Sequence, residues 1–357
     1  MFPFLLFFMK IRNFYRFVAL MLVITSTLCC CGKIEKLNKY STYSMDYFDT
    51  VITITGYEKT EEEFDRISSE MMSLLGEYHQ LYTIYHRFDG IENLCTVNEL
   101  VDGEHRTVTV DRRIIDMLLY AKEMYNKTDG IMNIAMGSVL SLWHDYRTIG
   151  KDNPEQASLP PMDLLTEAAK HTDINDIIID EAASTVTISD PQMKLDVGAI
   201  AKGYATERVA KTFEEKGITG YILNVGGNVR TIGAKGDGAD WTVGIEDPEG
   251  EDYLAYLELN GQSVVTSGSY QRFYYVDGKP YHHIIHPDTL MPATGYLSVS
   301  VVCKDSGMAD ALSTALFCLP QAQGQELIEQ ISNAEAMWVT EDKKMTFSSG
   351  WSQYEKK

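Results

Sequence analysis

The strongest constraint on the fold is a series of short apolar segments, separated by glycine-rich turns, in the second half of the chain. β-branched and aromatic residues concentrate in these segments, as expected for strands. They predict strands at 221–225, 229–234, 241–246, 253–259 and 296–303, with more short strands inside 262–286 and closing strands at 336–340 and 345–348. Helices and runs of sequential strands are mixed without strict βαβ alternation, which indicates an α+β fold rather than a doubly wound sheet.

Apolar residues recur at spacings of three and four elsewhere, as one buried face of a helix requires. This periodicity predicts helices at 61–82, 111–125, 162–170, 199–216, 308–319 and 323–331. Further strands are expected at 50–57, 176–180, 185–189 and 193–196. The segment 148–161 is polar and contains prolines, so it is predicted to be a surface loop, with a subdomain boundary near 150–160.

The first 30 residues differ from the rest of the chain. Lys10, Arg12 and Arg16 precede an apolar run from Phe17 to Leu28. That run is about 12 residues long, which is short for a bilayer of ~30 Å and typical of a secretory signal. An uncleaved N-terminal anchor is the alternative interpretation.

The apolar run ends in Leu28-Cys29-Cys30-Cys31-Gly32, which resembles a bacterial lipobox with Cys31 as the lipidated residue. Cys29 and Cys30 remain alternatives. Two or more acyl chains give stable membrane anchoring. We therefore predict a lipoprotein signal peptide at 1–30, a tether at 31–45 and a catalytic domain at 46–350, anchored on the extracytoplasmic face of a bacterial cell membrane.

Charge and cysteine content exclude several classes of protein. The chain has 357 residues and a formal net charge of −20, with a pI near 4.8. Such an acidic chain is a poor ligand for nucleic acid, although backbone amides or a metal ion can still bind a small anion. Cys95, Cys303 and Cys318 are scattered, so neither a disulfide framework nor a zinc site is expected. Common nucleotide, phosphate, zinc-protease and serine-hydrolase motifs are also missing from the sequence.

Two local patterns place backbone where a ligand could approach closely. In Asp196-Val-Gly-Ala-Ile-Ala-Lys202, a carboxylate ends a strand, small residues open a helix, and Lys202 lies in the first turns. The free N–H groups of a helix N-terminus favour phosphate. Asn224-Val-Gly-Gly-Asn228 provides a glycine pair after a strand. Each pattern also has an ordinary structural interpretation, as a strand–helix connection and a hairpin.

Two further patterns carry polar side chains. Thr266–Tyr270 is rich in hydroxyls and is followed about 15 residues later by the histidines of 282–286, as the two strands of one hairpin would place them. His283 could then act as an acid or base, or hold phosphate. Asp310 and Thr314 are spaced i,i+4 on one helix face among small apolar residues. A buried carboxylate there needs a counter-charge, and Mg²⁺ suits its oxygens.

Together these segments resemble the family of ApbE-type FAD:protein FMN transferases. The resemblance runs in order from about Tyr47 to Ser348. It is carried by FDTVITI at 48–54, TDGIMNIAMGSVLSLW at 128–143, LDVGAIAKGYA at 195–205, NVGGNVRTIG at 224–233, TSGSYQRFY at 266–274, HHIIHP at 282–287 and ADALSTALF at 309–317. It implies mixed or antiparallel sheets flanked by helices, and transfer of FMN from FAD to a Thr or Ser of a redox protein, with Mg²⁺ as cofactor.

The resemblance also implies roles for single residues. Asp310, Thr314 and the backbone of Ala199 would hold the metal, and His283 would be the acid/base or phosphate partner. Flavin contacts would come from Tyr85, Ile131, Met132, Asn133, Asp196, Lys202 and Ile285. The acceptor would be a Thr- or Ser-bearing subunit of a membrane or exported redox protein, and no nucleic acid is expected.

Four departures from the family pattern are visible. Phe48-Asp49-Thr50 replaces Met-Gly-Thr, Asn133 replaces Asp, His286 replaces an Asp, and Leu290 replaces a Gly. Two other activities fit the same residues. One is a FAD pyrophosphatase that releases FMN and AMP, and the other is a lipoprotein that binds FAD without catalysis.

Overall fold

A computed structural model describes residues 36–99, 106–248, 250 and 252–356 of the chain. The predicted signal peptide and Cys31 lie outside the described residues. The main element is an eight-stranded sheet in the order β1-β2-β6-β7-β10-β13-β14-β15, in which all neighbouring strands pair antiparallel. Its strands are β1 (Asn38–Ser44), β2 (Ile52–Glu58), β6 (Tyr221–Val225), β7 (Asn228–Ile232), β10 (Ser263–Gly268), β13 (Tyr296–Cys303), β14 (Glu335–Thr340) and β15 (Met345–Phe347).

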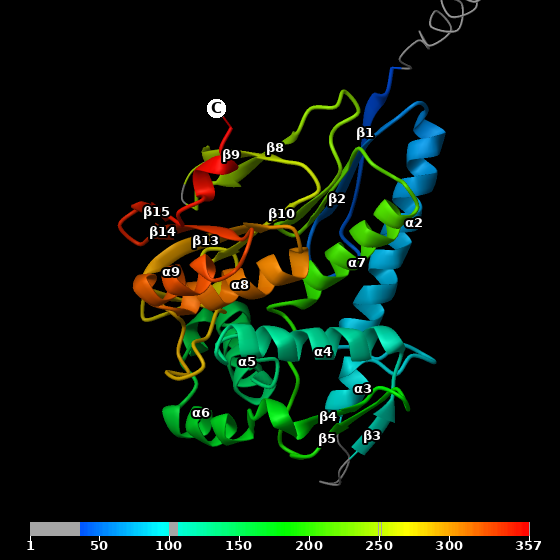
Figure 1. Cartoon of the computed structure of the whole chain (residues 1–357). Coiled ribbons are helices and arrows are strands. Elements are labelled where there is room, and N and C mark those ends of the chain that lie inside the picture. The colour runs from blue at the N-terminus through cyan, green and yellow to red at the C-terminus, as the bar shows by residue number, and fades with distance from the viewer. Residues whose placement is uncertain (1–35, 100–105, 249, 251, 357) are drawn as a thin grey trace, which may run out of the picture.

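Helices α7 (Ala201–Glu215) and α8 (Ser306–Cys318) pack side by side against one face of this sheet (Figure 1). Strand residues alternate between the two faces. Val265, Val301 and Trp338 face α8, whereas Val264 and Val302 face the hairpin of β8 (Trp241–Glu246) and β9 (Tyr253–Leu259). The sheet is therefore buried on both sides, which fixes its register.

The remaining elements surround the two central helices. Helix α2 (Glu61–Tyr82) packs along α7, α4 (Arg112–Lys127) contacts α2, and α9 (Gln321–Glu329) contacts α8 (Figure 1). A lower part contains α3 (Leu94–Asn98), α5 (Gly137–Asp152), α6 (Met162–Ala168) and the small sheet of β3 (Arg106–Thr109), β5 (Thr185–Ile188) and β4 (Ile177–Asp180). A second hairpin, β11 (Phe273–Val276) with β12 (Lys279–His282), packs on α5.

The predicted α+β class with antiparallel sheets flanked by helices is confirmed, and α2 has the predicted bounds. Three expectations were wrong. The predicted tether contains β1, which pairs with β2 over seven residues. The predicted loop 148–161 begins with the last turn of α5. The strand expected at 193–196 is absent from this described segment, which makes only an isolated bridge from Lys194 to Met136.

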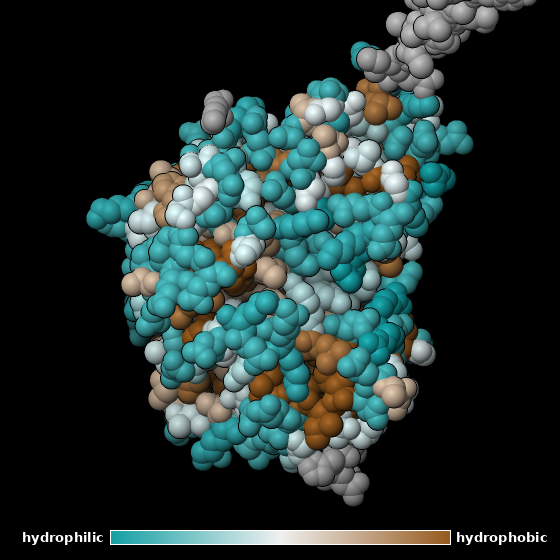
Figure 2. Space-filling view, in the orientation of Figure 1, coloured by the Kyte–Doolittle hydropathy of each residue, from teal (hydrophilic) through white to brown (hydrophobic). Residues whose placement is uncertain are grey.

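Surface and cysteine properties agree with the composition. The face in Figure 2 is largely hydrophilic, and its apolar side chains gather mainly below α4. Cys95, Cys303 and Cys318 are buried and free, as expected for small apolar core residues. Among the helices of the described residues, none is long and apolar enough to cross a membrane.

Candidate functional site

One cavity of about 490 Å³ lies where the sheet, α7 and α8 meet the lower part of the molecule. All eleven residues assigned to the site from sequence line it: Tyr85, Ile131, Met132, Asn133, Asp196, Ala199, Lys202, His283, Ile285, Asp310 and Thr314. They come from loops and helices separated by more than 200 residues in the chain. Gly226 and Asn228 of the glycine-pair pattern line the cavity as well, so all four sequence patterns converge on this single cavity.

The sequence predicts one hairpin that contains Thr266–Tyr270 and the histidines of 282–286. The structure does not pair these two segments. Thr266 and Ser267 belong to β10, which pairs with β7 and β13, whereas His282 belongs to β12, which pairs with β11. Both segments nevertheless reach the cavity, because the loops after β10 and β12 end beside it. The prediction of a common site was right about proximity and wrong about strand pairing.

Asp310 occupies the cavity end between α7 and α8, and its side chain is almost fully buried. Three donors approach one of its two oxygens. The Gly203 N–H donates to Oδ2 at 2.8 Å, Asn228 Nδ2 donates to it at 3.3 Å, and Lys202 Nζ lies 3.9 Å away. Burial raises the pKa of this carboxyl. Its other oxygen, Oδ1, has no hydrogen-bond partner among the described residues.

The hydrogen bond from Gly203 to Asp310 also leaves the carbonyl oxygen of Ala199 without its usual helical donor. In an α-helix the N–H of Gly203 would donate to the carbonyl of Ala199, four residues earlier. Here it donates to Asp310 instead, and the helix begins at Ala201. No N–H of the described residues donates to the Ala199 carbonyl. Among the described residues, the Ala199 carbonyl just before α7 and Asp310 Oδ1 are thus two unpaired oxygens on residues that line the same cavity.

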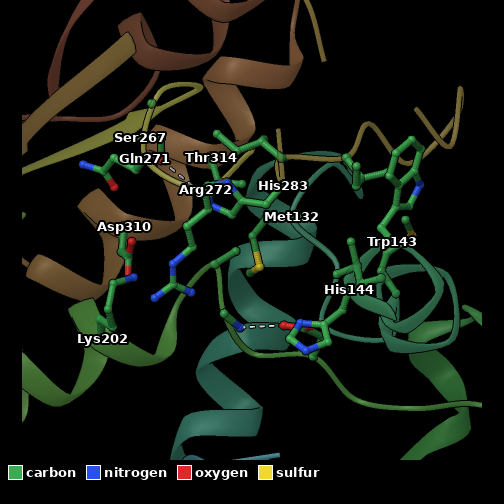
Figure 3. Close-up of a pocket in the computed structure, with 18 of the residues that line it drawn as sticks. Met132, Trp143, His144, Lys202, Ser267, Gln271, Arg272, His283, Asp310 and Thr314 are labelled. Atoms are coloured by element: carbon green, nitrogen blue, oxygen red, sulfur yellow. Dashed lines mark hydrogen bonds and ion pairs between the residues drawn. The ribbon is translucent and has the colours of Figure 1, made fainter. Parts of the chain in front are cut away.

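Three oxygen atoms at this end of the cavity are suitable ligands for a hard cation. Asp310 Oδ1, the Ala199 carbonyl and the Thr314 hydroxyl are the oxygen ligands that Mg²⁺ prefers. Figure 3 shows Asp310, Thr314 and Lys202 on the same side of the cavity. Within the described part of the chain, no three His, Cys, Asp or Glu side chains are grouped to hold a metal ion. A cation at this end would therefore depend on mixed donors, and the residues present fit Mg²⁺.

Adding one methyl group at Gly203 should disturb this end of the cavity. A Cβ there would lie 2.3 Å from the Ser306 carbonyl oxygen and 2.5 Å from Asp310 Cβ. We expect Gly203→Ala to lower the free energy of unfolding by about 1–3 kcal/mol, as in other overpacked cores, and to displace Asp310 at this end of the cavity. Urea denaturation measures the first effect.

Gly324→Ala in α9 is the matched control, because its Cβ would meet no atom closer than 3.4 Å. That variant should be as stable as the wild type or more stable by up to about 1 kcal/mol. Equal stabilities of the two variants would contradict the close approach of α7 and α8.

The two adjacent histidines have different environments. His282 Nε2 hydrogen-bonds the Ala293 carbonyl at 2.8 Å, and its Nδ1 accepts from the Ile284 N–H, so both ring nitrogens are used. His283 lines the cavity, and its buried Nδ1 has no partner. Burial, reinforced by Arg147 and Arg272, lowers the pKa of His283 to about 3. His283 is therefore neutral at pH 7 and can accept a proton.

This pKa predicts how His283 titrates. The imidazole should stay neutral from pH 9 down to about pH 4, without a titration midpoint near its usual 6.5. Because the unfolded chain binds this proton below pH 6.5 and the folded chain does not, His283 should reduce stability as the pH falls from 6.5 towards 3. Imidazole ¹⁵N NMR, with His283→Gln to assign the signal, checks the value. A midpoint between pH 6 and 7 would contradict it.

Two arginines of the cavity were not predicted from sequence. Arg147 on α5 is partly buried and has no carboxylate oxygen within 4.0 Å among the described residues. Within the described part of the chain, its guanidinium has one hydrogen-bonding contact, with His144 Nδ1 at 3.1 Å. Arg272 extends into the cavity (Figure 3), and it contacts the Asp49 carbonyl and carboxylate at 3.2 and 3.5 Å. With Lys202 they form a cationic wall in an acidic protein, where an anion would be favoured.

Aromatic rings cover the side of the cavity formed by α5. The Tyr85 ring, which is 58% exposed, lies 5.3 Å from the His144 ring, and Trp143 Nε1 donates to the Leu290 carbonyl. Met132 points towards the middle of the cavity in Figure 3. Such a surface can stack against a planar heteroaromatic ring.

The structure explains two departures from the family pattern by hydrogen bonding. Asn133 donates to the Thr172 carbonyl and accepts from the Ala135 N–H, a pair of roles that an ionised Asp could not fill. His286 Nδ1 accepts from the Asp288 N–H, as a carboxylate would in the same turn.

The other departures have left-handed backbone. Phe48, Asp49 and Leu290 have φ values of 58°, 52° and 58°, a conformation that favours glycine. Leu290 is buried in the cluster that includes Trp143 and Ile285, so apolar burial offsets its strain. Asp49 is exposed, and its carbonyl accepts a hydrogen bond from Arg272.

Comparison with known proteins identifies relatives over almost the whole described chain. The model of the ApbE family matches residues 48–338. A FAD:protein FMN transferase of Klebsiella pneumoniae is 31% identical over 315 residues, 87% of this chain and 93% of the relative. Another, of Treponema pallidum, is 30% identical and covers 96% of both chains.

Solved structures agree. The ApbE protein of Thermotoga maritima superimposes with a TM-score of 0.77 at 27% identity, over 90% of this chain and all of its own. The flavin transferase ApbE of Vibrio cholerae has the same fold, with a TM-score of 0.74 at 23% identity, over 89% of this chain and 99% of its own. The chain belongs to the ApbE family.

Proposed function

We propose that this protein is a Mg²⁺-dependent FAD:protein FMN transferase. It moves FMN from FAD to a Thr or Ser hydroxyl of a redox protein, forms a phosphoester and releases AMP. The observation that carries the proposal is that one cavity brings together the Asp310 carboxylate, the Ala199 carbonyl and the Thr314 hydroxyl with neutral His283 and a cationic wall. The names of the relatives supply the reaction class.

Different side chains bind the diphosphate and the flavin nucleotide of FAD. Lys202, Arg147 and Arg272 neutralise the diphosphate. The flavin nucleotide is contacted by Tyr85, Ile131, Met132, Asn133, Asp196 and Ile285. A Mg²⁺ ion held by Asp310, Thr314 and the Ala199 carbonyl would stabilise the charge on the phosphate oxygens, which is the main requirement of phosphoryl transfer.

The reaction exchanges one phosphorus–oxygen bond for another. The acceptor hydroxyl oxygen attacks the FMN phosphorus, and the bond from that phosphorus to the bridging oxygen breaks. AMP leaves with the bridging oxygen. The hydroxyl proton passes to the imidazole of His283, which is uncharged at pH 7 and whose Nδ1 has no hydrogen-bond partner among the described residues.

Incubation with FAD, Mg²⁺ and a Thr-bearing acceptor tests the proposal, with the Thr→Val acceptor as control. Transfer predicts an acceptor that remains fluorescent after denaturation and one AMP per flavin attached. Equal amounts of free FMN and AMP, with an unlabelled acceptor, would replace the transferase by a FAD pyrophosphatase. Binding of FAD without AMP release would leave a non-catalytic flavin-binding lipoprotein.

We also propose that the protein is exported and lipid-anchored on the outer face of the cell membrane through Cys31. The basic cluster, the apolar run and the lipobox-like end of residues 1–31 support this. Metabolic labelling with a radioactive fatty acid should mark the wild type and not Cys31→Ala. Labelling retained in Cys31→Ala and lost in Cys30→Ala would move the anchor to Cys30.

A further inference from the structure

A chain of three hydroxyls connects two of the proposed cation ligands, Thr314 and Asp310. Thr314 Oγ1 lies 3.3 Å from Ser267 Oγ, which lies 2.8 Å from Ser313 Oγ (Figure 3 shows Ser267 beside Thr314). Ser313 Oγ lies 2.9 Å from the main-chain carbonyl of Asp310. The chain thus begins at one proposed ligand and ends on the backbone of another, and it joins β10 to α8.

The last acceptor sets the direction of every bond in this chain. A carbonyl oxygen can only accept, so Ser313 must donate its single hydroxyl hydrogen to Asp310. Ser313 Oγ therefore accepts from Ser267, and Ser267 Oγ accepts from Thr314. The Thr314 hydrogen points to Ser267, and both lone pairs of the Thr314 oxygen stay free.

Without this chain the Thr314 side chain would have another partner. A Thr inside a helix commonly donates to the carbonyl four residues earlier, which here is the carbonyl of Asp310. Ser313 already uses that carbonyl. Rotation towards it would change χ1 of Thr314 and move the hydroxyl oxygen relative to Asp310 Oδ1.

We propose that Ser267 and Ser313 are positioning residues that present the Thr314 hydroxyl as a ligand to the divalent cation. The proposal rests on the Mg²⁺ site of the proposed function. Neither serine needs to touch the cation. Their effect on it follows from outer hydrogen bonds that orient a ligand, whose loss typically weakens metal binding by about 10–100-fold.

Calorimetric titration of the purified protein with Mn²⁺, which takes the same oxygen ligands as Mg²⁺, tests the inference without catalysis. We expect Ser267→Ala to raise the Kd for Mn²⁺ about tenfold, and Ser313→Ala to raise it as well. Ser267→Thr keeps the hydroxyl and should stay within about twofold of the wild type.

Ser300→Ala is the matched control. Ser300 is buried, as Ser313 is, and its hydroxyl pairs with Thr266 at 2.7 Å, but it takes no part in the chain to Thr314. Its Kd for Mn²⁺ should equal that of the wild type. A rise as large as that of Ser267→Ala would overturn the proposal, because any lost hydroxyl would then have the same effect.

A double variant, Ser267→Ala combined with Thr314→Ala, distinguishes a positioning role of Ser267 from a general loss of structure. In the Thr314→Ala protein, adding Ser267→Ala should cause no further change in the Kd for Mn²⁺, since the group that Ser267 positions is gone. A full additional tenfold loss would overturn the proposal, as would a wild type that does not bind Mn²⁺. A wild type that binds Mn²⁺ with the expected pattern but transfers no FMN would contradict the proposed function alone.

Discussion

Asp310→Asn is expected to lower FMN transfer by about 10³-fold, the scale seen when a preorganised electrostatic contact to a transition state is lost. The amide keeps the shape of the side chain and can still accept from the Gly203 N–H. It removes the negative charge that the cation requires. Steady-state release of AMP from FAD measures the loss.

The same variant should be as stable as the wild type or more stable. The Asp310 carboxylate is buried, and burial raises its pKa, which shows that the charged form is disfavoured there. Asp145→Asn is the matched control, because Asp145 is exposed on α5 and does not line the cavity. Its activity should change by less than about twofold, since exposed charges are screened. Undiminished transfer by Asp310→Asn would refute the metal assignment.

Arg230→Ala should lower the free energy of unfolding by about 3–5 kcal/mol, the usual effect of removing one partner of a buried ion pair. Arg230 is fully buried on β7, and its guanidinium lies 2.9 Å from Glu207 and 3.0 Å from Glu214, both on α7. Glu207 is itself buried and also accepts from the Ser306 N–H at the start of α8. Without Arg230 this carboxylate would remain charged in the core.

Urea denaturation of Arg66→Ala provides the comparison for Arg230→Ala. Arg66 forms an i,i+4 ion pair with Glu70 at 3.0 Å on the exposed side of α2. Such surface pairs contribute about 0.3–0.5 kcal/mol. If both variants lost the same stability, the buried network would not be the link between β7, α7 and α8 that the structure indicates.

The residues of the site were predictable where their spacing was local. Asp310 and Thr314 share a helix face because α8 has the period that the sequence predicts. The small residues before Lys202 mark the start of α7 in the same way. What the sequence does not contain is the diversion of the Gly203 N–H to Asp310, because that bond joins residues 107 positions apart.

The errors come from interactions that are not local. Strand β1 is polar and lies at an edge of the sheet, so no apolar alternation marked it, and pairing with β2 makes it a strand. Helix α5 contains Gly137 and Gly150, where a Cβ would collide with Lys194 and Tyr274. These glycines weaken the helical pattern in the sequence, although they allow close packing in the structure. Because the sequence did not predict α5, it could not predict the position of Arg147 either.

The backbone amide of Gly203, which donates to Asp310, can report by NMR whether an ion occupies the site. Its hydrogen bond ends on the Asp310 carboxylate, so an ion that draws charge from that carboxylate must alter the shielding and the exchange rate of one backbone proton. Glycine amides occupy their own region of the ¹H–¹⁵N spectrum of the ¹⁵N-labelled protein, so no substitution is needed to introduce the reporter. Occupancy of the cavity can thus be followed at a single atom, independently of flavin colour or turnover.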